Sequence, residues 1–383
     1  MTQLFYNLLP FCTNVKKLII VIFIILSCCC INAQVSFSGT VYDQATNQPL
    51  PDVYVSFNGT VAYAITDDSG KFELTLAQRL NTQLVFSHIA YEMVIIENPF
   101  DEFPEEIYME QRFNMLDNVV VSANVSPEYA DPFTRAQKLT AFRKQFLGET
   151  PAGKSCKIMN ESDIELWYNV HTNTLSASSY QPIVVINEYL GYQILFILLD
   201  FKVEYTTARQ NSVLENNNLY ATQSHTMVDI FRQNSYIPLN SNNARLSYFA
   251  VLSSFTDLSP NDARIKKRRD EVYNRSSTFF FKNLANNTLN DAGFEISTGK
   301  TKIDNYWYTT QDTLSLKKVR LISVDTALKI SVLFQRGKSD ITFNSNTLLV
   351  DYYGNIDNPY KVIFTGLMGQ SRAGNILPFD YEP

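Results

Sequence analysis

The sequence predicts a mainly β protein with some α-helix, in which an N-terminal β-sandwich precedes a larger β-rich α+β domain. Three observations lead to this prediction. Apolar residues recur with a period of two from residue 35 to about residue 113, and turn-forming clusters interrupt them at short intervals. Beyond residue 130, helix start signals stand among further strand-like segments. The chain is 45% hydrophobic, which is enough to build a core in each of two domains.

The composition of the 383-residue chain excludes several classes of protein. With only 13 Gly and 14 Pro beside abundant apolar residues, the chain is neither disordered nor collagen-like. Its five Cys, four of which precede Ile31, are too few for a disulfide scaffold. A formal net charge of −6 argues against nucleic acid as a partner.

The N-terminus, residues 1–33, has the pattern of a secretory signal peptide. A pair of lysines precedes an apolar run at residues 18–26, and small or polar residues follow as far as Ala33. The run is much shorter than the roughly 20 residues that a membrane-spanning helix needs. We therefore expect cleavage between Ala33 and Gln34, and an exported protein of the periplasm or the outer-membrane-associated cell envelope.

Cys28 and Cys29 leave lipidation open as an alternative. A lipoprotein signal needs a Cys as the new N-terminus behind a small-residue motif. The segment that begins at Leu26 half fits this motif, because Cys28 stands where Gly or Ala is expected. Under ordinary cleavage Cys156 is the one thiol left, and we expect it to pack as a small buried hydrophobic residue.

Residues 34–113 are predicted to form the sandwich. Val53, Val55 and Phe57 share one face of a strand, and residues 72–76 repeat the alternation after a turn at residues 67–70. Strict alternation is typical of an antiparallel sheet with one buried and one wet face. The short spacing between turns favours a sandwich over βαβ units.

Three segments of this region, residues 38–43, 49–55 and 66–72, resemble the carboxypeptidase regulatory-like domain. The resemblance covers residues 35–96 and implies a transthyretin-like sandwich of about seven strands. Its motif residues in this chain are Gly39, Pro49, Asp67, Gly70, Phe72 and Tyr91. In one departure from the family pattern, Ala90 stands where Gly usually precedes the tyrosine, so we expect a different local turn.

The resemblance does not extend to peptidase chemistry. A zinc carboxypeptidase needs a His and a Glu close in sequence and a later His. The three histidines are His88, His171 and His225, and none has a Glu two or three residues away. We therefore predict no catalytic residues, no metal and no cofactor. A hydrolase with scattered residues stays open as an alternative, with His171 and His225 as its obvious bases.

Residues 114–130 are predicted to be a linker that begins with a strand. Residues 115–123 are similar to the segment that joins such a sandwich to the plug of TonB-dependent outer-membrane receptors. One interpretation is a strand offered to an energy-transducing partner by β-addition. We favour the other, a plain strand ahead of a linker, because no plug follows.

Residues 131–383 are predicted to form an α+β domain of unknown function. Helices are expected from Asp131-Pro132 to Gly148, after Ser259-Pro260-Asn261-Asp262, and around residues 276–284. Strands are expected at residues 164–170, 183–186, 219–221, 329–335, 347–353 and 360–365. The basic run at residues 266–269 has acidic neighbours, which is typical of a solvated helix face.

Together these features predict a non-enzymatic binding or scaffold protein of the cell envelope, with the sandwich as its interaction module. The expected partner is an envelope protein or a glycan. Aromatic clusters at residues 306–308 and 352–353 are candidates for stacking on sugar rings, although such residues usually pack in sheets. The alternatives are an outer-membrane component, either a small β-barrel or a receptor-associated protein, and an envelope hydrolase.

Overall fold

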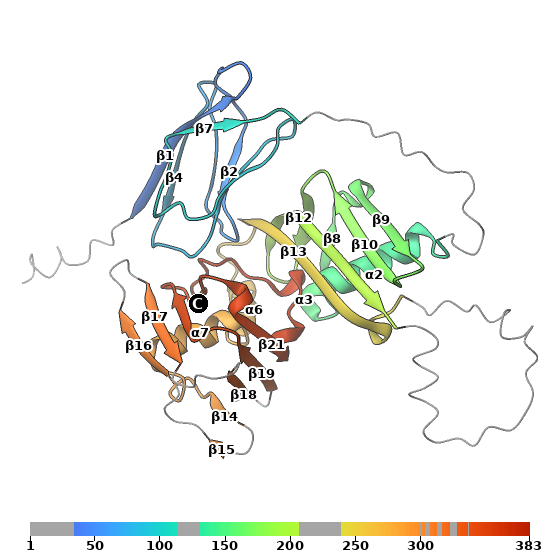
Figure 1. Ribbon diagram of the computed structural model, residues 1–383, viewed down its shortest axis with the longest axis vertical. Helices are drawn as coiled ribbons and strands as arrows, with labels where there is room; N and C mark the ends of the chain where they lie inside the picture. Colours follow the sequence, from blue (N-terminus) through green and yellow to red (C-terminus); the bar gives the residue numbers. More distant parts are fainter. Residues whose placement is uncertain are drawn as a thin grey trace, which may run out of the picture.

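The computed structural model describes residues 34–112, 131–206, 239–298, 301–302, 307–311, 316–321, 328–335 and 337–383. Strands predominate over helices, which confirms the predicted fold class. Figure 1 shows the N-terminal sandwich in blue, a sheet with its helix in green and yellow, and a third part in orange to red. The predicted signal peptide with Cys28, Cys29 and Ala33, the linker at residues 114–130, and His225 lie outside the described residues.

Residues 34–112 form a sandwich of seven strands. These are β1 (Val35–Asp43), β2 (Tyr54–Phe57), β3 (Tyr63–Ile65), β4 (Lys71–Leu76), β5 (Leu84–Ser87), β6 (Val94–Ile96) and β7 (Glu106–Met109). One sheet has the order β4-β1-β7 and the other has the order β3-β2-β5-β6. Their inner faces bury a shared core that includes Phe37, Val55 and Phe86. The alternation read from the sequence therefore identifies the inner faces correctly.

The central unit, which comprises the described residues of 131–257, is built around two long paired strands. Strands β12 (Tyr192–Tyr205) and β13 (Ala244–Asp257) run antiparallel along their full length. On the other side of β12 lie β11 (Ile183–Asn187) with β8 (Cys156–Ile158), and β10 (Thr174–Ser179) with β9 (Ile164–Asn169). Short helices α3 (Pro151–Lys154), η2 (Glu161–Asp163) and η4 (Ser241–Asn243) connect these elements.

Helix α2 (Arg135–Leu147) covers one face of this sheet. Phe142 and Phe146 project from it and pack their rings against Phe201 and Phe196 of β12. The helix begins later than the expected start at residue 131, because its N-cap is Thr134, which forms a capping box with Gln137. It ends at Gly148 as predicted.

The C-terminal unit, which comprises the described residues of 258–383, has a hydrophobic core of its own. Two helices precede its strands, α6 (Ala263–Tyr273), which Asp262 caps, and α7 (Ser277–Asn286), which Ser276 caps. One sheet has the order β15-β14-β18-β19-β21 and the other has the order β16-β17-β20. The strands are β14 (Glu295–Thr298), β15 (Thr301–Lys302), β16 (Trp307–Gln311), β17 (Lys317–Leu321), β18 (Leu328–Phe334), β19 (Gly337–Phe343), β20 (Thr347–Val350) and β21 (Val362–Gly366). Three 3₁₀ turns, η5 (Pro359–Lys361), η6 (Met368–Gln370) and η7 (Ala373–Asn375), flank β21.

The basic run at residues 266–269 is not a fully solvated face, so that prediction was wrong for Arg269. Its side chain is only 7% exposed and donates two hydrogen bonds of 2.8 and 2.7 Å to the carboxylate of Asp257 at the end of β13. Its guanidinium carbon lies 3.9 Å from the ring centre of Tyr192. Arg269 therefore joins α6 to the central sheet through a paired and stacked buried charge.

The three parts meet at a junction formed by the turn after β2, the edge of β13 and the C-terminal segment. The Gly59 N–H donates to the Ser253 carbonyl at 2.6 Å, and the Phe255 N–H donates to the Thr60 carbonyl at 2.9 Å. The Phe379 N–H donates to the Gly59 carbonyl at 2.6 Å. Gly59 has a φ of +77°, and a Cβ there would lie 2.5 Å from the Phe379 ring. The close approach of three backbones therefore requires glycine at this position.

We predict that Gly59→Ala destabilises the protein more than Gly293→Ala does. Both substitutions place a Cβ at a positive φ, which costs about 1–2 kcal/mol. Only the change at Gly59 adds a collision with Phe379, since the nearest atom to a Cβ on Gly293 is 4.0 Å away. Thermal unfolding followed by circular dichroism measures the difference. Equal melting temperatures for the two variants would show that the junction tolerates a side chain.

Asp380 gives the junction a dependence on pH. Burial raises the pKa of Asp380 from its ordinary value of 3.8 to about 6. Its Oδ1 has no hydrogen-bond partner among the residues that the structure describes. Folding raises this pKa, so the folded protein is favoured below about pH 3.8, where the carboxyl group is protonated in both the folded and the unfolded state. This contribution to the free energy of unfolding is lost as the pH rises through about 6.

We predict that Asp380→Asn stabilises the protein at pH 8 and has little effect at pH 4. The rise in the pKa from 3.8 to about 6 corresponds to an upper limit of about 3 kcal/mol. Urea unfolding at the two pH values measures the change, and Asp68→Asn in an exposed turn is the control. A gain in stability that is the same at both pH values would contradict the role assigned to this carboxyl group.

Candidate binding site between the sandwich and the central sheet

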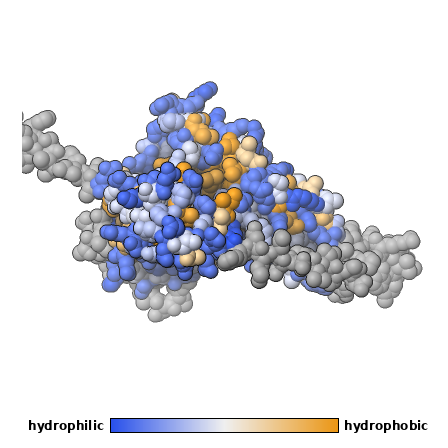
Figure 2. All heavy atoms as spheres, turned by 90° about the horizontal axis from the view of Figure 1, so that it is seen from above, coloured by the Kyte–Doolittle hydropathy of each residue, from blue (hydrophilic) through white to orange (hydrophobic). Residues whose placement is uncertain are grey.

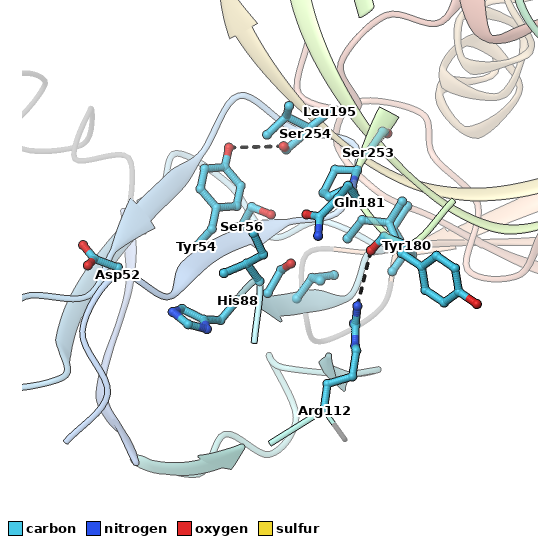
Figure 3. A pocket seen from close by; sticks show the side chains of 16 residues that line it. Asp52, Tyr54, Ser56, His88, Arg112, Tyr180, Gln181, Leu195, Ser253 and Ser254 are labelled. Atoms are coloured by element: carbon cyan, nitrogen blue, oxygen red, sulfur yellow. Dashed lines mark hydrogen bonds between the residues drawn. The ribbon is translucent and has the colours of Figure 1, made fainter. Parts of the chain in front are cut away.

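A pocket of about 450 Å³ lies between the outer face of the sandwich and the central sheet. One wall comes from β2, β5 and the loop that follows β5, and the other comes from β12 and β13. Figure 3 shows Tyr54, Ser56 and His88 on the sandwich side, and Leu195 and Ser254 on the opposite side. The surface viewed from the sandwich end has apolar atoms in its middle, surrounded by hydrophilic ones (Figure 2).

Strand alternation places these side chains in the pocket. On β2 the core residues Val55 and Phe57 alternate with Tyr54 and Ser56, which face outward. On β12 and β13, core residues likewise alternate with residues that line the pocket, namely Leu195, Ile197, Leu252 and Ser254. The period of two therefore gives each strand one face for its own core and one face for the pocket.

The interior of the pocket combines apolar walls with hydroxyl groups. Val85 and Leu252 are buried among the apolar lining. The Tyr54 hydroxyl donates to Ser254 Oγ at 3.1 Å across the interface. Burial raises the pKa of Tyr54, so this hydroxyl stays protonated. The Ser56 and Ser87 hydroxyls make no hydrogen bond with any described residue, so both can bond to a ligand.

Ionisable groups lie at the mouth of the pocket. The Arg112 guanidinium points towards Tyr180, donates to its carbonyl at 3.3 Å and pairs with Glu92 at 3.3 Å (Figure 3). His88 accepts a hydrogen bond of 3.2 Å from the Ala90 N–H at Nδ1, which leaves the proton of its neutral ring on Nε2. Burial lowers the pKa of His88, which favours the neutral ring at neutral pH.

The pocket contains Asp52, His88 and Ser87, the residue types of a serine hydrolase, but hydrogen bonds do not connect them as a catalytic triad. A nucleophile is activated by a hydrogen bond to its base, and a third group orients that base. No hydrogen bond joins His88 to either of the other two residues in the described part of the chain, and its Nδ1 is occupied by its own loop. The described residues hold no group of three potential metal ligands either.

The sandwich motif residues predicted from the sequence build the fold and lie outside the pocket. Gly39 on β1 faces Phe72 on β4, and a Cβ there would lie 2.6 Å from the Glu105 carbonyl oxygen. Asp67 Oδ1 accepts the Ser69 and Lys71 N–H groups at 2.9 Å. These contacts shape the strands and turns of the sandwich.

Two further motif residues, Gly70 and Pro49, meet beside β1. Gly70 closes the β3–β4 turn with a φ of +70°. A Cβ on Gly70 would lie 2.5 Å from the Val41 carbonyl oxygen and 3.2 Å from Pro49. Pro49 itself forms a bridge with Tyr42. Glycine is required at position 70 for both its conformation and its contacts.

Tyr91 joins the turn after β5 to the end of β1. Its hydroxyl donates to Asp43 Oδ2 at 2.7 Å, and Gln111 Nε2 donates to the same oxygen at 3.2 Å. The Tyr91 hydrogen bond lowers the pKa of Asp43 and raises the pKa of Tyr91. Ala90 does not have a positive φ, so this turn forms without the usual glycine.

The other sequence candidates are not brought into the pocket. His171 lies in the turn between β9 and β10. Burial raises the pKa of Cys156 to about 12, and its Sγ bonds to the Ala152 carbonyl at 3.3 Å, as expected for a packed thiol. Tyr54, Ser87 and Arg112 were not predicted as site residues, because no local sequence pattern distinguishes them from other residues of the sandwich.

Comparison with known proteins agrees with this geometry. Residues 37–121 match the family model of the CarboxypepD_reg-like domain. The sandwich is a CarboxypepD_reg-like domain. Such a domain is non-catalytic. No curated protein matches the chain. Within the described part of the chain, no helix is long and apolar enough to cross a membrane.

We predict that Tyr54→Phe lowers the free energy of unfolding by about 0.5–1.5 kcal/mol, because it removes the hydrogen bond to Ser254. Tyr63→Phe is the matched control, since Tyr63 stacks on Tyr54 from the neighbouring strand but is 44% exposed. Urea denaturation of the full chain measures both changes. A loss of stability of equal size in the two variants would show that the hydrogen bond between Tyr54 and Ser254 does not stabilise the interface.

Proposed function

We propose that this chain is a non-enzymatic binding protein of the cell envelope, with the CarboxypepD_reg-like sandwich as its interaction module. The interdomain pocket, defined by the residues that line it between β2–β5 and β12–β13, is its ligand site. The observation that carries this proposal is an apolar recess between two sheet faces, in which the hydroxyls of Ser56 and Ser87 have no hydrogen bond to a described residue.

The lining favours a compact ligand with an apolar body and a polar or anionic end. Val85, Leu195 and Leu252 provide apolar contact area, which supplies most of the binding free energy in such sites. Ser56 and Ser87 can orient a polar group. Arg112 at the mouth is paired with Glu92, which is exposed, so an anionic group that binds there has to compete with Glu92 for the guanidinium.

A hydrolase is the second candidate, because Asp52, His88 and Ser87 share the pocket. Binding is better supported, since the hydrogen bond from Ala90 holds His88 within its own loop. Hydrolysis of p-nitrophenyl acetate that disappears in His88→Ala would favour the hydrolase over the binding protein.

The envelope location rests on the predicted signal peptide. A receptor-associated role rests on residues 115–123, which lie outside the described residues. Fractionation of native cells tests the location independently of the pocket.

We predict that Ser87→Trp abolishes binding of the apolar anionic dye 1-anilinonaphthalene-8-sulfonate. The indole ring would fill the space between β5 and the central sheet. The matched control is Ser36→Trp on the exposed outer face of β1, which leaves the pocket open. Fluorescence titration of the full chain should show saturable binding in the unsubstituted protein and in the control. Dye binding by Ser87→Trp with unchanged affinity would refute the assignment of the site.

A further inference from the structure

A second and larger recess, the polar groove, lies where the sandwich, the central sheet and the C-terminal unit meet. Its volume is about 1040 Å³. It extends from the sandwich loops at residues 79–83 and 97–101, past β12 and β13, to residues 354–362. It does not share its polar residues with the interdomain pocket.

Four of the five charged side chains that line the groove form ion pairs within it. Arg79 pairs with Asp101 at 2.8 Å, and Lys361 pairs with Asp357 at 2.5 Å. The remaining carboxylate, Glu97, accepts a hydrogen bond of 3.1 Å from Gln83. A charged ligand would have to compete with these pairs, so the groove favours a neutral ligand.

Amide side chains supply most of the other polar groups. They are Asn58, Asn81, Gln83, Asn98, Asn355 and Asn358. Five of the six make hydrogen bonds within the protein, and Asn81 and Asn355 hold the walls together through bonds to neighbouring backbone carbonyls. Asn98 is exposed, and its amide makes no hydrogen bond with any residue that the structure describes. Because an amide both donates and accepts, it matches the vicinal hydroxyls of a sugar.

Tyr360 lines the groove, and Tyr248 lies beside Tyr360. Tyr360 is 77% exposed, and Tyr248 on β13 is 41% exposed. The neighbouring Tyr360 hydroxyl raises the pKa of Tyr248. Tyr360 follows the Asn358-Pro359 turn, in which Asn358 Oδ1 accepts the Tyr360 N–H at 2.9 Å. The turn therefore places an exposed aromatic face beside a polar recess.

We propose that the polar groove binds a neutral oligosaccharide, with Tyr360 stacking on a sugar ring and the Asn98 amide bonding to its hydroxyls. An aromatic face provides apolar contact for the C–H side of a pyranose ring, and an amide satisfies hydroxyls around its edge. A strand-like peptide is less suited to this place, because the adjoining backbone groups of β13 at Ser253 and Phe255 already bond to the sandwich turn.

Isothermal titration calorimetry of the full chain with neutral hexasaccharides tests the proposal. The probes are the hexamers of glucose in β-1,4, β-1,3 and α-1,4 linkage, of mannose, of xylose and of N-acetylglucosamine, with oligogalacturonate as the charged counterpart. At least one neutral hexamer should bind. Tyr360→Ala should weaken that binding by about tenfold or more, whereas Tyr360→Phe should keep most of it, because the ring remains.

Tyr352→Ala is the matched control, since Tyr352 belongs to the same unit and is 49% exposed but lies outside the groove. It should bind the oligosaccharide as the unsubstituted chain does, and all three variants should keep the same melting temperature. Failure of every neutral hexamer to bind at millimolar concentration would overturn the proposal. Binding of oligogalacturonate alone, or equal losses in Tyr360→Ala and Tyr352→Ala, would overturn it as well.

Discussion

The arrangement of the three parts depends on the backbone contact at Gly59. Three backbone hydrogen bonds join the sandwich turn to the free edge of β13 and to Phe379 in the C-terminal segment. These bonds satisfy strand-edge groups that would otherwise be open to pairing with another chain. They also set the distance between the sandwich and the central sheet. The interdomain pocket and the polar groove both border this contact, because each contains residues at or next to it, Ser253 in one and Asn58 in the other.

Buried charge determines how the parts are arranged in the same region. Arg269 joins the C-terminal unit to the end of β13 through Asp257 and Tyr192, while the Tyr381 hydroxyl donates to Asp270 on the same helix at 2.6 Å. A buried pair of this kind contributes little net stability but is costly to break, so it favours one arrangement of the parts over others. Asp380 adds a buried carboxyl group whose ionisation opposes folding.

The sequence predicted the sandwich because its signal is local. A period of two and a few turn residues identify the inner face of β2 and the turn at Gly70, and the structure confirms both. The same pattern assigned Tyr54 and Ser56 to a wet face, because alternation shows which way a side chain points but not what lies there. The partner of Tyr54 is Ser254, 200 residues away, and no local pattern predicts that contact. Arg269 was misread for the same reason: its neighbours in sequence are charged, but its neighbours in space are Asp257 and an aromatic ring.

We propose that the sandwich and the central sheet act together as one binding site. Hydrogen–deuterium exchange of the full chain, measured with and without 1-anilinonaphthalene-8-sulfonate, tests it most directly. A ligand held between the two sheets should slow exchange in β5 and in residues 252–254 of β13 together, with the same dependence on dye concentration. Protection confined to one of the two sheets, or absent from both, would contradict the claim.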